Sequence, residues 1–486
     1  MEKSILNQLL ENRTLFHFYQ LCQIPRGSGN EKQVSDYILK WACSLGLQAK
    51  QDEVYNLVIK KEASAGYEKA APILLQAHLD MVCDKEPGAE HDFLKDAIPG
   101  EIKDDWIFSA KGTTLGADCG IGVALIMAIL EDNDLKAPEI EVLLTVREET
   151  DMAGAYHVSQ KDFHSKRIIN LDISPDNRLL MGSCGGEAIE VEIPVERCIV
   201  EAKTLCLRVG GLKGGHSGSD IHRGRGNAIL LLGRILDEIC AEGIPVQLVR
   251  IHGGNSRLAI PREAEAEIIV PEKYWEQLGN SCKKINAIVR DTWQLNATDI
   301  DILLECNENR TVNSFTKIST EHIIKALMIM PNGIREMSDV LLGNVESSSN
   351  LGVIRTGINQ VECIIEMRGN HEFTRKDIER KIMLVAENFG GSCKIHSSYP
   401  AWRYQKNSEL RKLILEQYRN QYQQEMECVC VHAGNEVGIL FEKLDVEDAV
   451  AMGPTRLFFH TPKEKLYVKS VEQFEVFLKN ILEQLK

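Results

Sequence analysis

Histidine and acidic residues follow several apolar runs in the first part of the chain, and such side chains bind divalent cations or transfer protons. His78 and Asp80 come two residues apart after the run APILLQA, so alternation along a strand puts them on the same side. Further carboxylates adjoin two other apolar runs or a glycine turn: Asp118, Glu148, Glu149 and Asp172. Metal binding and acid–base chemistry are therefore the first hypotheses for this segment.

Carboxylates beside apolar segments need a compensating charge, because an unpaired buried charge loses its hydration. Five carboxylates brought together without cations would repel one another and hold some of their protons. One or two divalent cations remove this conflict. Imidazole and carboxylate ligands suit zinc, manganese or cobalt, and the lack of paired thiolates argues against a structural zinc ribbon.

Each of these motifs also has an ordinary structural interpretation. An isolated H-x-D is usually an incidental surface pair, a Glu-Glu pair at a strand end is usually solvated, and a glycine-rich turn is usually only a turn. The joint occurrence of all of them beside strand-like segments favours a functional site.

Strand-like and helical patterns alternate in the region that must position these residues. Helical spacing covers 31–41 and 120–131, and apolar strand-like runs cover 71–82, 139–146 and 167–173. Such alternation with near-continuous apolar strands is typical of a mostly parallel sheet covered by helices on both faces. Because functional side chains gather beyond the carboxyl ends of such strands, we expect the clusters to converge there.

The pattern changes near residue 187, where apolar and polar residues begin to alternate as in a half-exposed antiparallel sheet. After residue 397 a helical pattern and a strand-like run return. We therefore predict an α/β fold with a discontinuous catalytic domain of 1–186 and 398–486. A smaller α+β domain with an antiparallel sheet, residues 187–397, is inserted into it.

Composition narrows the classes of protein further. The formal net charge is −15, which disfavours binding to nucleic acid or to an anionic membrane surface. No apolar run approaches the ~18–20 residues of a membrane-spanning helix. Fourteen scattered cysteines indicate reduced thiols and not a disulfide framework. We expect a soluble cytoplasmic protein that binds neither nucleic acid nor membranes.

Longer motifs extend along nearly the whole chain: QAHLDMV (76–82), His91-Asp92-Phe93, GTTLGAD (112–118), REETDMAGA (147–155), NLDIS (170–174), GGHSGSDI (214–221), AIPRE (259–263), HAGNE (432–436) and FFHTP (458–462). With these motifs the chain resembles the aminoacyl-histidine dipeptidases (Xaa-His dipeptidases, bacterial carnosinase-like enzymes). These belong to the co-catalytic zinc metallopeptidases that include glutamate carboxypeptidase-like and aminoacylase-like enzymes. The resemblance implies a dinuclear metal-dependent dipeptidase that hydrolyses Xaa-His and related dipeptides. It also implies a homodimer formed through the inserted domain, which would be a lid.

The resemblance also implies roles for particular residues. Two divalent metal ions per chain are expected, zinc first, with cobalt or manganese as alternatives. His78 and Asp172 would hold one ion, Glu149 and His460 the other, and Asp118 would bridge them, with a cis peptide bond between Asp118 and Cys119. Only the resemblance nominates His460, because no local spacing marks it.

The same resemblance names the catalytic and substrate-binding residues. Glu148 would be the general base that activates a metal-bridging water, and Asp80 would orient His78. His216 of the glycine-rich loop would stabilise the oxyanion. Arg368 and Gly434 would bind the substrate, and Arg368 suits its terminal carboxylate. A solvated arginine at a strand end is an equally ordinary interpretation of Arg368.

Two residues depart from the pattern of that family. Cys119 stands where relatives usually carry aspartate or asparagine, and its thiol is a possible soft ligand. Leu258 stands where the dipeptidases tend to have asparagine, which concerns specificity more than the reaction. Two alternatives therefore stay open: another amide hydrolase of the same superfamily, such as a deacylase or tripeptidase, and a catalytically silent peptide-binding relative.

Overall fold

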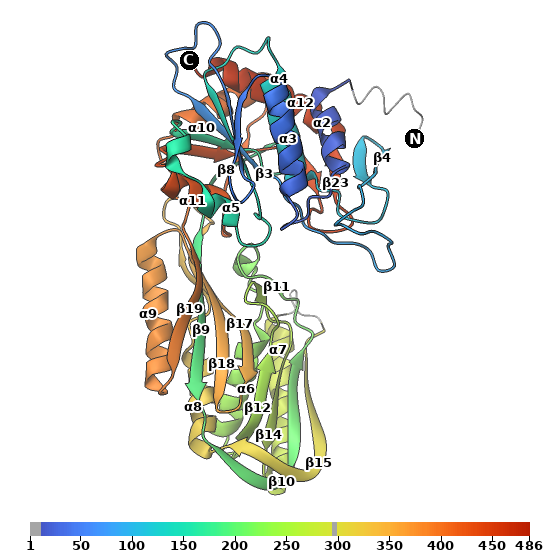
Figure 1. The fold of residues 1–486 in the computed structure, drawn as a ribbon. Coiled ribbons are helices and arrows are strands. Elements are labelled where there is room, and N and C mark those ends of the chain that lie inside the picture. Colours follow the sequence, from blue (N-terminus) through green and yellow to red (C-terminus); the bar gives the residue numbers. More distant parts are fainter. Residues whose placement is uncertain (1–10, 294–298) are drawn as a thin grey trace. The chain divides into compact units, whose positions relative to one another are not determined.

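The computed structural model describes residues 11–293 and 299–486, which form two compact units (Figure 1). Unit 1 comprises the described residues up to Gly182, together with Trp402–Cys430 and Asn435–Lys486. Unit 2 comprises Ser183–Ala401 and the short segment Val431–Gly434. The chain therefore passes from unit 1 into unit 2 and back twice.

Unit 1 is built on a mixed sheet of eight strands. Their order is β1 (Gln48–Gln51), β2 (Leu57–Lys61), β6 (Ile140–Thr145), β3 (Ile73–His78), β7 (Arg167–Asn170), β21 (Asp448–Ala451), β8 (Arg178–Ser183) and β20 (Glu427–Val431). The four central strands β6, β3, β7 and β21 pair in parallel, whereas β1–β2, β2–β6 and β21–β8 pair antiparallel. All residues of β3 and β6 are buried, so both faces of these strands are covered. The predicted α/β class is confirmed, with the parallel pairing concentrated at the centre of the sheet.

Helices and a small second sheet complete unit 1. The helices are α2 (Arg13–Cys22), α3 (Lys32–Ser44), α4 (Ala117–Glu131), α5 (Ala153–His157), α10 (Glu409–Tyr422), α11 (Glu436–Lys443) and α12 (Val468–Gln484), with a 3₁₀ turn at Gln160–Asp162. The small sheet has the order β22 (Arg456–Leu457), β23 (Lys465–Tyr467), β5 (Trp106–Ser109) and β4 (Gly100–Lys103). Helix α4 is apolar on all sides and lies in the hydrophobic core with β3 and β6, as expected for an interior helix.

Unit 2 has a nine-stranded sheet whose assigned pairings are all antiparallel, as the alternating pattern predicts. Its strands are β15 (Asp301–Phe315), β10 (Arg197–Gly210), β14 (Ala264–Ile269), β12 (Gln247–Gly253), β17 (Val345–Thr356), β18 (Gln360–Gly369), β9 (Gly185–Pro194) and β19 (Ser392–Tyr399), with β16 (Gly333–Met337) beside β17. A two-stranded ribbon joins β11 (Gly215–His216) to β13 (Ala259–Ile260).

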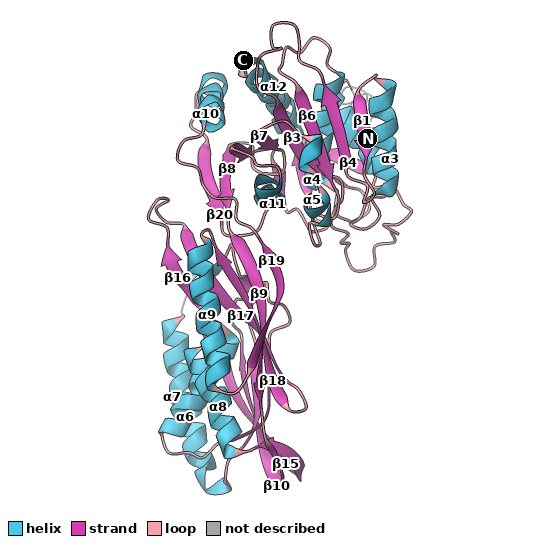
Figure 2. Ribbon diagram, turned by 60° about the vertical axis from the view of Figure 1, so that its left-hand side comes forward, coloured by secondary structure: helices cyan, strands magenta, loops and turns pink. Residues whose placement is uncertain are grey.

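The helices of unit 2 lie against one face of this sheet (Figure 2). They are α6 (Ala228–Ala241), α7 (Trp275–Thr292), α8 (Lys317–Ile329) and α9 (Glu372–Asn388), with 3₁₀ turns at Ile221–Arg223 and Glu272–Tyr274. Their apolar residues and those of the sheet form the core of this unit. Within residues 11–293 and 299–486, no helix is both long and apolar enough to cross a membrane.

Candidate metal centre

Three elements of unit 1 bring His78, Asp118 and Asp172 together. His78 is the last residue of β3, Asp118 lies in the first turn of α4, and Asp172 follows β7. The His78 Nε2 atom lies 3.4 Å from Asp118 Oδ1 and 3.7 Å from Asp172 Oδ2. His78 is only 1% exposed, and this nitrogen has no hydrogen-bond partner among the described residues. A cation bound between His78, Asp118 and Asp172 would satisfy this buried nitrogen.

His460 occupies the other side of Asp118. Its Nε2 atom lies 3.3 Å from Asp118 Oδ2 and 2.8 Å from Glu149 Oε1. The Glu149 side chain is 7% exposed, so this contact with His460 is largely shielded from water. The two oxygens of Asp118 therefore face two different imidazoles, and each imidazole has one further carboxylate beside it.

The donor set of this cluster fits divalent cations. Ligand atoms of His78, Asp118 and Glu149 lie within 4.8 Å of one another, and so do those of His78, Cys119 and Asp172. Imidazole nitrogen and carboxylate oxygen are the donors of catalytic zinc sites. The Asp118–Cys119 peptide bond, which orients two of these residues, is cis, as the resemblance implies.

Electrostatics at the cluster show an excess of negative charge. Burial by itself would lower the pKa of His460, but its contacts with Asp118 and Glu149 raise the pKa to about 10. Burial and the neighbouring Asp118 raise the pKa of Asp172 to about 7. The raised pKa values mean that Asp172 and His460 tend to bind protons, which reduces the negative charge of the cluster. Bound cations would compensate the same charge, so the cluster is suited to them.

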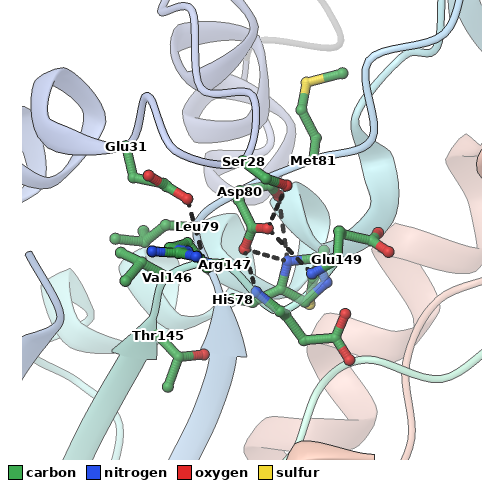
Figure 3. A network of polar contacts seen from close by, with 12 residues as sticks. Ser28, Glu31, His78, Leu79, Asp80, Met81, Thr145, Val146, Arg147 and Glu149 are labelled. Carbon is green, nitrogen blue, oxygen red and sulfur yellow. Dashed lines mark hydrogen bonds and ion pairs between the residues drawn. The ribbon is translucent and has the colours of Figure 1, made fainter. Parts of the chain in front are cut away.

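Asp80 lies two residues after the end of β3 and connects the other parts of the cluster (Figure 3). Its Oδ1 atom lies 3.3 Å from His78 Nδ1 and accepts a hydrogen bond from the Glu148 backbone at 3.0 Å. Its Oδ2 atom accepts from Ser28 Oγ at 2.7 Å and from the Glu149 backbone at 3.1 Å. Although burial would raise the pKa of Asp80, His78 and these donors lower it to about 2. The carboxylate therefore stays charged and holds His78 and the Glu148–Glu149 loop together.

Glu148 is half-buried beside the cluster, in the loop between β6 and α5. Burial raises the pKa of its carboxyl well above the ordinary value, and the nearby Asp172, Glu436 and Glu149 act in the same direction. A carboxyl group whose pKa is shifted in this direction is typical of acid–base catalysts.

Two buried residues that the sequence analysis did not identify complete this site. Arg456 is 3% exposed and donates to Asp118 Oδ1 at 2.9 Å and to Asp172 Oδ1 at 3.0 Å. Glu464 accepts from the backbone of Leu115, Gly116 and Asp118 at 2.7, 2.8 and 3.0 Å. Each stands four residues from His460 in the sequence, but no local pattern marks either one. Their partners are more than 280 residues away along the chain, so only the fold reveals them.

Two further predicted site residues, Arg368 and Gly434, lie beside Tyr399 in unit 2. Arg368, 3% exposed, donates to Tyr399 Oη at 2.7 Å and to Ser217 Oγ at 3.3 Å. A Cβ atom on Gly434 would lie 2.8 Å from the Tyr399 ring, so this position requires glycine or a shift of the ring. Tyr399 thus contacts both predicted substrate-binding residues, although no sequence pattern singled it out.

His216 follows Gly214 and Gly215 in the same unit, and its ring nitrogens have different partners. Its Nδ1 atom accepts hydrogen bonds from the backbone of Gly218 and Ser219, both at 3.1 Å. Burial and the charge of Arg368 lower the pKa of His216, so the neutral ring carries its proton on Nε2. The Nε2–H group is therefore available as a hydrogen-bond donor. Leu258 is partly exposed beside this loop, and its carbonyl accepts from the Ser217 backbone at 2.8 Å.

Known proteins match the chain over most of its length. The family described as peptidase family M20/M25/M40 matches residues 74–484. A cytosol non-specific dipeptidase of Escherichia coli K12 is 34% identical over 484 residues, which is 99% of each chain. The crystal structure of an aminoacylhistidine dipeptidase from Vibrio alginolyticus superposes with a TM-score of 0.89 at 34% identity, covering 97% of this chain and 96% of the other. A tripeptidase from Staphylococcus aureus shares the fold, with a TM-score of 0.57, 16% identity and 98% of each chain covered.

Proposed function

The chain belongs to peptidase family M20/M25/M40, and we propose that it is a dinuclear metal-dependent dipeptidase acting on Xaa-His and related dipeptides. The arrangement around Asp118 carries this proposal, because its two oxygens face His78 and His460 separately. Two relatives that match almost the whole chain at 34% identity are named as dipeptidases. They favour dipeptides over the substrates of a deacylase or a tripeptidase.

Five residues of unit 1 would hold the two ions. His78 and Asp172 belong to the first position, Glu149 and His460 to the second, and Asp118 to both. Zinc suits this set of imidazoles and carboxylates, with cobalt or manganese as alternatives. The buried His78 Nε2 atom supports the assignment, because it faces Asp118 and Asp172 and has no hydrogen-bond partner among the described residues.

The residues around these positions would carry out the proton transfers of peptide hydrolysis. When bound, the two cations would polarise the scissile carbonyl and make a water molecule more acidic. Glu148 would take the proton of the attacking water and deliver it to the leaving amine. Asp80 would keep His78 in one tautomer and orientation, and its contacts with the Glu148–Glu149 backbone would hold the base in place.

Unit 2 would supply the groups that recognise the substrate. Arg368 is a buried cation whose Nε atom has no hydrogen-bond partner among the described residues, which suits the carboxylate terminus of a dipeptide. Gly434 would leave room for the peptide beside Tyr399. The Nε2–H group of His216 would donate to the oxyanion. We keep the predicted bounds of 1–186 and 398–486 for the catalytic domain and 187–397 for the lid, which lie within four residues of those of the compact units except for Val431–Gly434 of unit 2.

We also propose that the protein is a cytoplasmic homodimer that associates through the lid domain. The name of the E. coli relative places that protein in the cytosol. Exposed apolar residues at and after the β16 edge strand of unit 2, here called the β16 patch, offer an interface: Ile334, Met337, Val340 and Leu342.

A histidine-release assay tests the proposed activity. Metal-free protein receives zinc, cobalt or manganese and is then offered β-alanyl-histidine and a panel of α-dipeptides, with a chelator as control. Metal-dependent release of histidine is the expected result. Failure to cleave any dipeptide while two ions are bound would contradict the dipeptidase assignment and favour a deacylase. Failure to bind metal would favour a silent relative.

A further inference from the structure

Cys119 places a thiol directly at the candidate metal centre. It follows Asp118 in the first turn of α4 and is fully buried. Its Sγ atom, a ring nitrogen of His78 and a carboxylate oxygen of Asp172 lie within 4.8 Å of one another. Cys119 is the one cysteine that belongs to a group of potential metal ligands among the described residues.

The surroundings of this thiol hold it in place. A Cβ atom on Gly122 would lie 2.7 Å from Sγ, so the sulfur occupies space that any larger residue at 122 would fill. Sγ also lies 3.5 Å from the Leu171 carbonyl oxygen, one residue before Asp172. The close packing against Gly122 and the contact with the Leu171 carbonyl thus hold the sulfur beside Asp172.

A second observation in the same group points to a ligand. His78 Nε2 is buried, faces the carboxylates and has no hydrogen-bond partner in the described residues. An ordinary core cysteine behaves as a small apolar group and needs no such neighbour. Cys22 has that ordinary environment: it is also buried in unit 1, its thiol donates to the Leu115 carbonyl at 3.9 Å, and it belongs to none of the groups of potential ligands among the described residues.

We propose that Cys119 Sγ is an additional ligand of the metal ion held by His78 and Asp172. This inference rests on the dinuclear centre proposed above. On coordination the S–H bond is replaced by a sulfur–metal bond, and the proton leaves to solvent. Because thiolate is a soft ligand, this position selects zinc, cobalt or cadmium over manganese.

Cobalt spectroscopy tests the sulfur–metal bond without relying on activity. Metal-free protein is loaded with two equivalents of Co²⁺, bound cobalt is measured, and the near-ultraviolet spectrum is recorded. We expect a sulfur-to-cobalt charge-transfer band in the wild type that is lost in Cys119→Ser. The matched variant Cys22→Ser, which removes another buried thiol of unit 1, should keep the band. In competition with a chelator, Cys119→Ser should lose about tenfold or more in Cd²⁺ affinity while Mn²⁺ affinity stays nearly unchanged.

Two outcomes overturn the proposal in distinguishable ways. Two bound cobalt ions without a band that depends on Cys119 would remove the thiolate ligand and leave the dinuclear centre intact. No bound cobalt would overturn the centre and this inference together. If Cys119→Ser fails to fold, ¹¹³Cd nuclear magnetic resonance spectra of the cadmium-loaded wild type test the sulfur–metal bond instead. A resonance shifted downfield toward sulfur coordination supports the ligand, and two resonances typical of oxygen and nitrogen ligands exclude it.

Discussion

Individual carboxylates at the candidate centre have different tasks because their neighbours differ. Asp80 accepts three hydrogen bonds and lies beside His78, so its charge is stabilised. Glu148 has no comparable set of donors, and burial raises its pKa. The same chemical group therefore acts as an orienting anion at one position and is suited to proton transfer at the other.

Glu148→Gln tests the base. The amide cannot accept a proton, so we expect kcat to fall by about three orders of magnitude. Metal content should stay at the wild-type value, because Glu148 is not among the proposed ligands. Metal analysis and dipeptide hydrolysis measure the two effects, with the exposed Glu101→Gln as a control expected to behave as wild type. Turnover close to wild type would exclude Glu148 as the base.

Arg456→Lys tests the guanidinium that connects Asp118 and Asp172. Lysine keeps the charge but cannot donate to both carboxylates in the same fixed geometry. We expect zinc affinity to fall about 10–100-fold, the usual effect of removing a group that orients metal ligands. Chelator competition measures this change, and Arg178→Lys, at a partly exposed ion pair with Glu427, serves as control. Unchanged zinc affinity would show that Arg456 does not position these ligands.

At the scale of elements, the ends of β3, β6 and β7 place the site where the apolar runs of the sequence predicted it. β3 ends at His78, so Asp80 belongs to the following loop and reaches its partners from there. The segment Ala117–Glu131 of α4 is kinked at Asp118 and Cys119, whose backbone angles are not helical. The regular helix therefore covers the predicted 120–131, and Asp118 and Cys119 lie in the kinked segment that leads into it.

The segment Val431–Gly434 of unit 2 carries a histidine that should make stability depend on pH. His432 Nε2 lies 2.7 Å from Ser348 Oγ, and its ionisable neighbours are Arg368, His216 and His222. Burial, together with Arg368, lowers the pKa of His432 to about 3. The folded state therefore stays neutral where the unfolded chain, with a pKa of about 6.5, binds a proton. The contribution of His432 to the free energy of unfolding is therefore fully present above pH 6.5 and is lost as the pH falls from 6.5 toward 3.

His432→Gln removes the ionisable group and with it this pH dependence of stability. Between pH 7 and pH 5, the wild type should lose more free energy of unfolding than the variant, by up to about 1.4 kcal/mol for each pH unit below 6.5. Urea unfolding at several pH values measures the difference. His396→Gln, at an exposed histidine of the same unit, is the control and should leave the slope of the wild type unchanged apart from a small ion-pair effect. Equal slopes for wild type and His432→Gln would contradict a buried, neutral His432.

At the scale of the whole molecule, sequence patterns predicted the fold class and brought most of the centre into one region. Local periodicity identified β3, β6 and β7 because buried parallel strands are almost entirely apolar. It could not identify His460, Arg456 or Glu464, whose partners lie hundreds of residues away. Tyr399, which lies between Arg368 and Gly434, was missed for the same reason. Such long-range contacts follow from tertiary packing, which local patterns do not record.

The β16 patch gives the dimer proposal a specific test. Leu342 is 90% exposed, so its replacement by glutamate should leave the fold of the chain unchanged. In a homodimer formed through this patch, Leu342→Glu would bury a charge and shift the protein toward monomer. Sedimentation equilibrium measures the shift, and Ile358→Glu, 85% exposed elsewhere on unit 2, serves as control. A wild-type monomer, or a dimer that Leu342→Glu leaves intact, would contradict an interface at this patch.

Two ions that share Asp118, both needed for dipeptide hydrolysis, are the basis of the proposed mechanism. Titration of the metal-free protein with zinc, with bound zinc and histidine release measured on the same samples, tests this most directly. We predict two zinc ions per chain in the wild type, with full activity only when both are bound. Asp118→Asn, which weakens the shared ligand, should lower both quantities. Full activity with one ion per chain, or two tightly bound ions in Asp118→Asn, would contradict the claim.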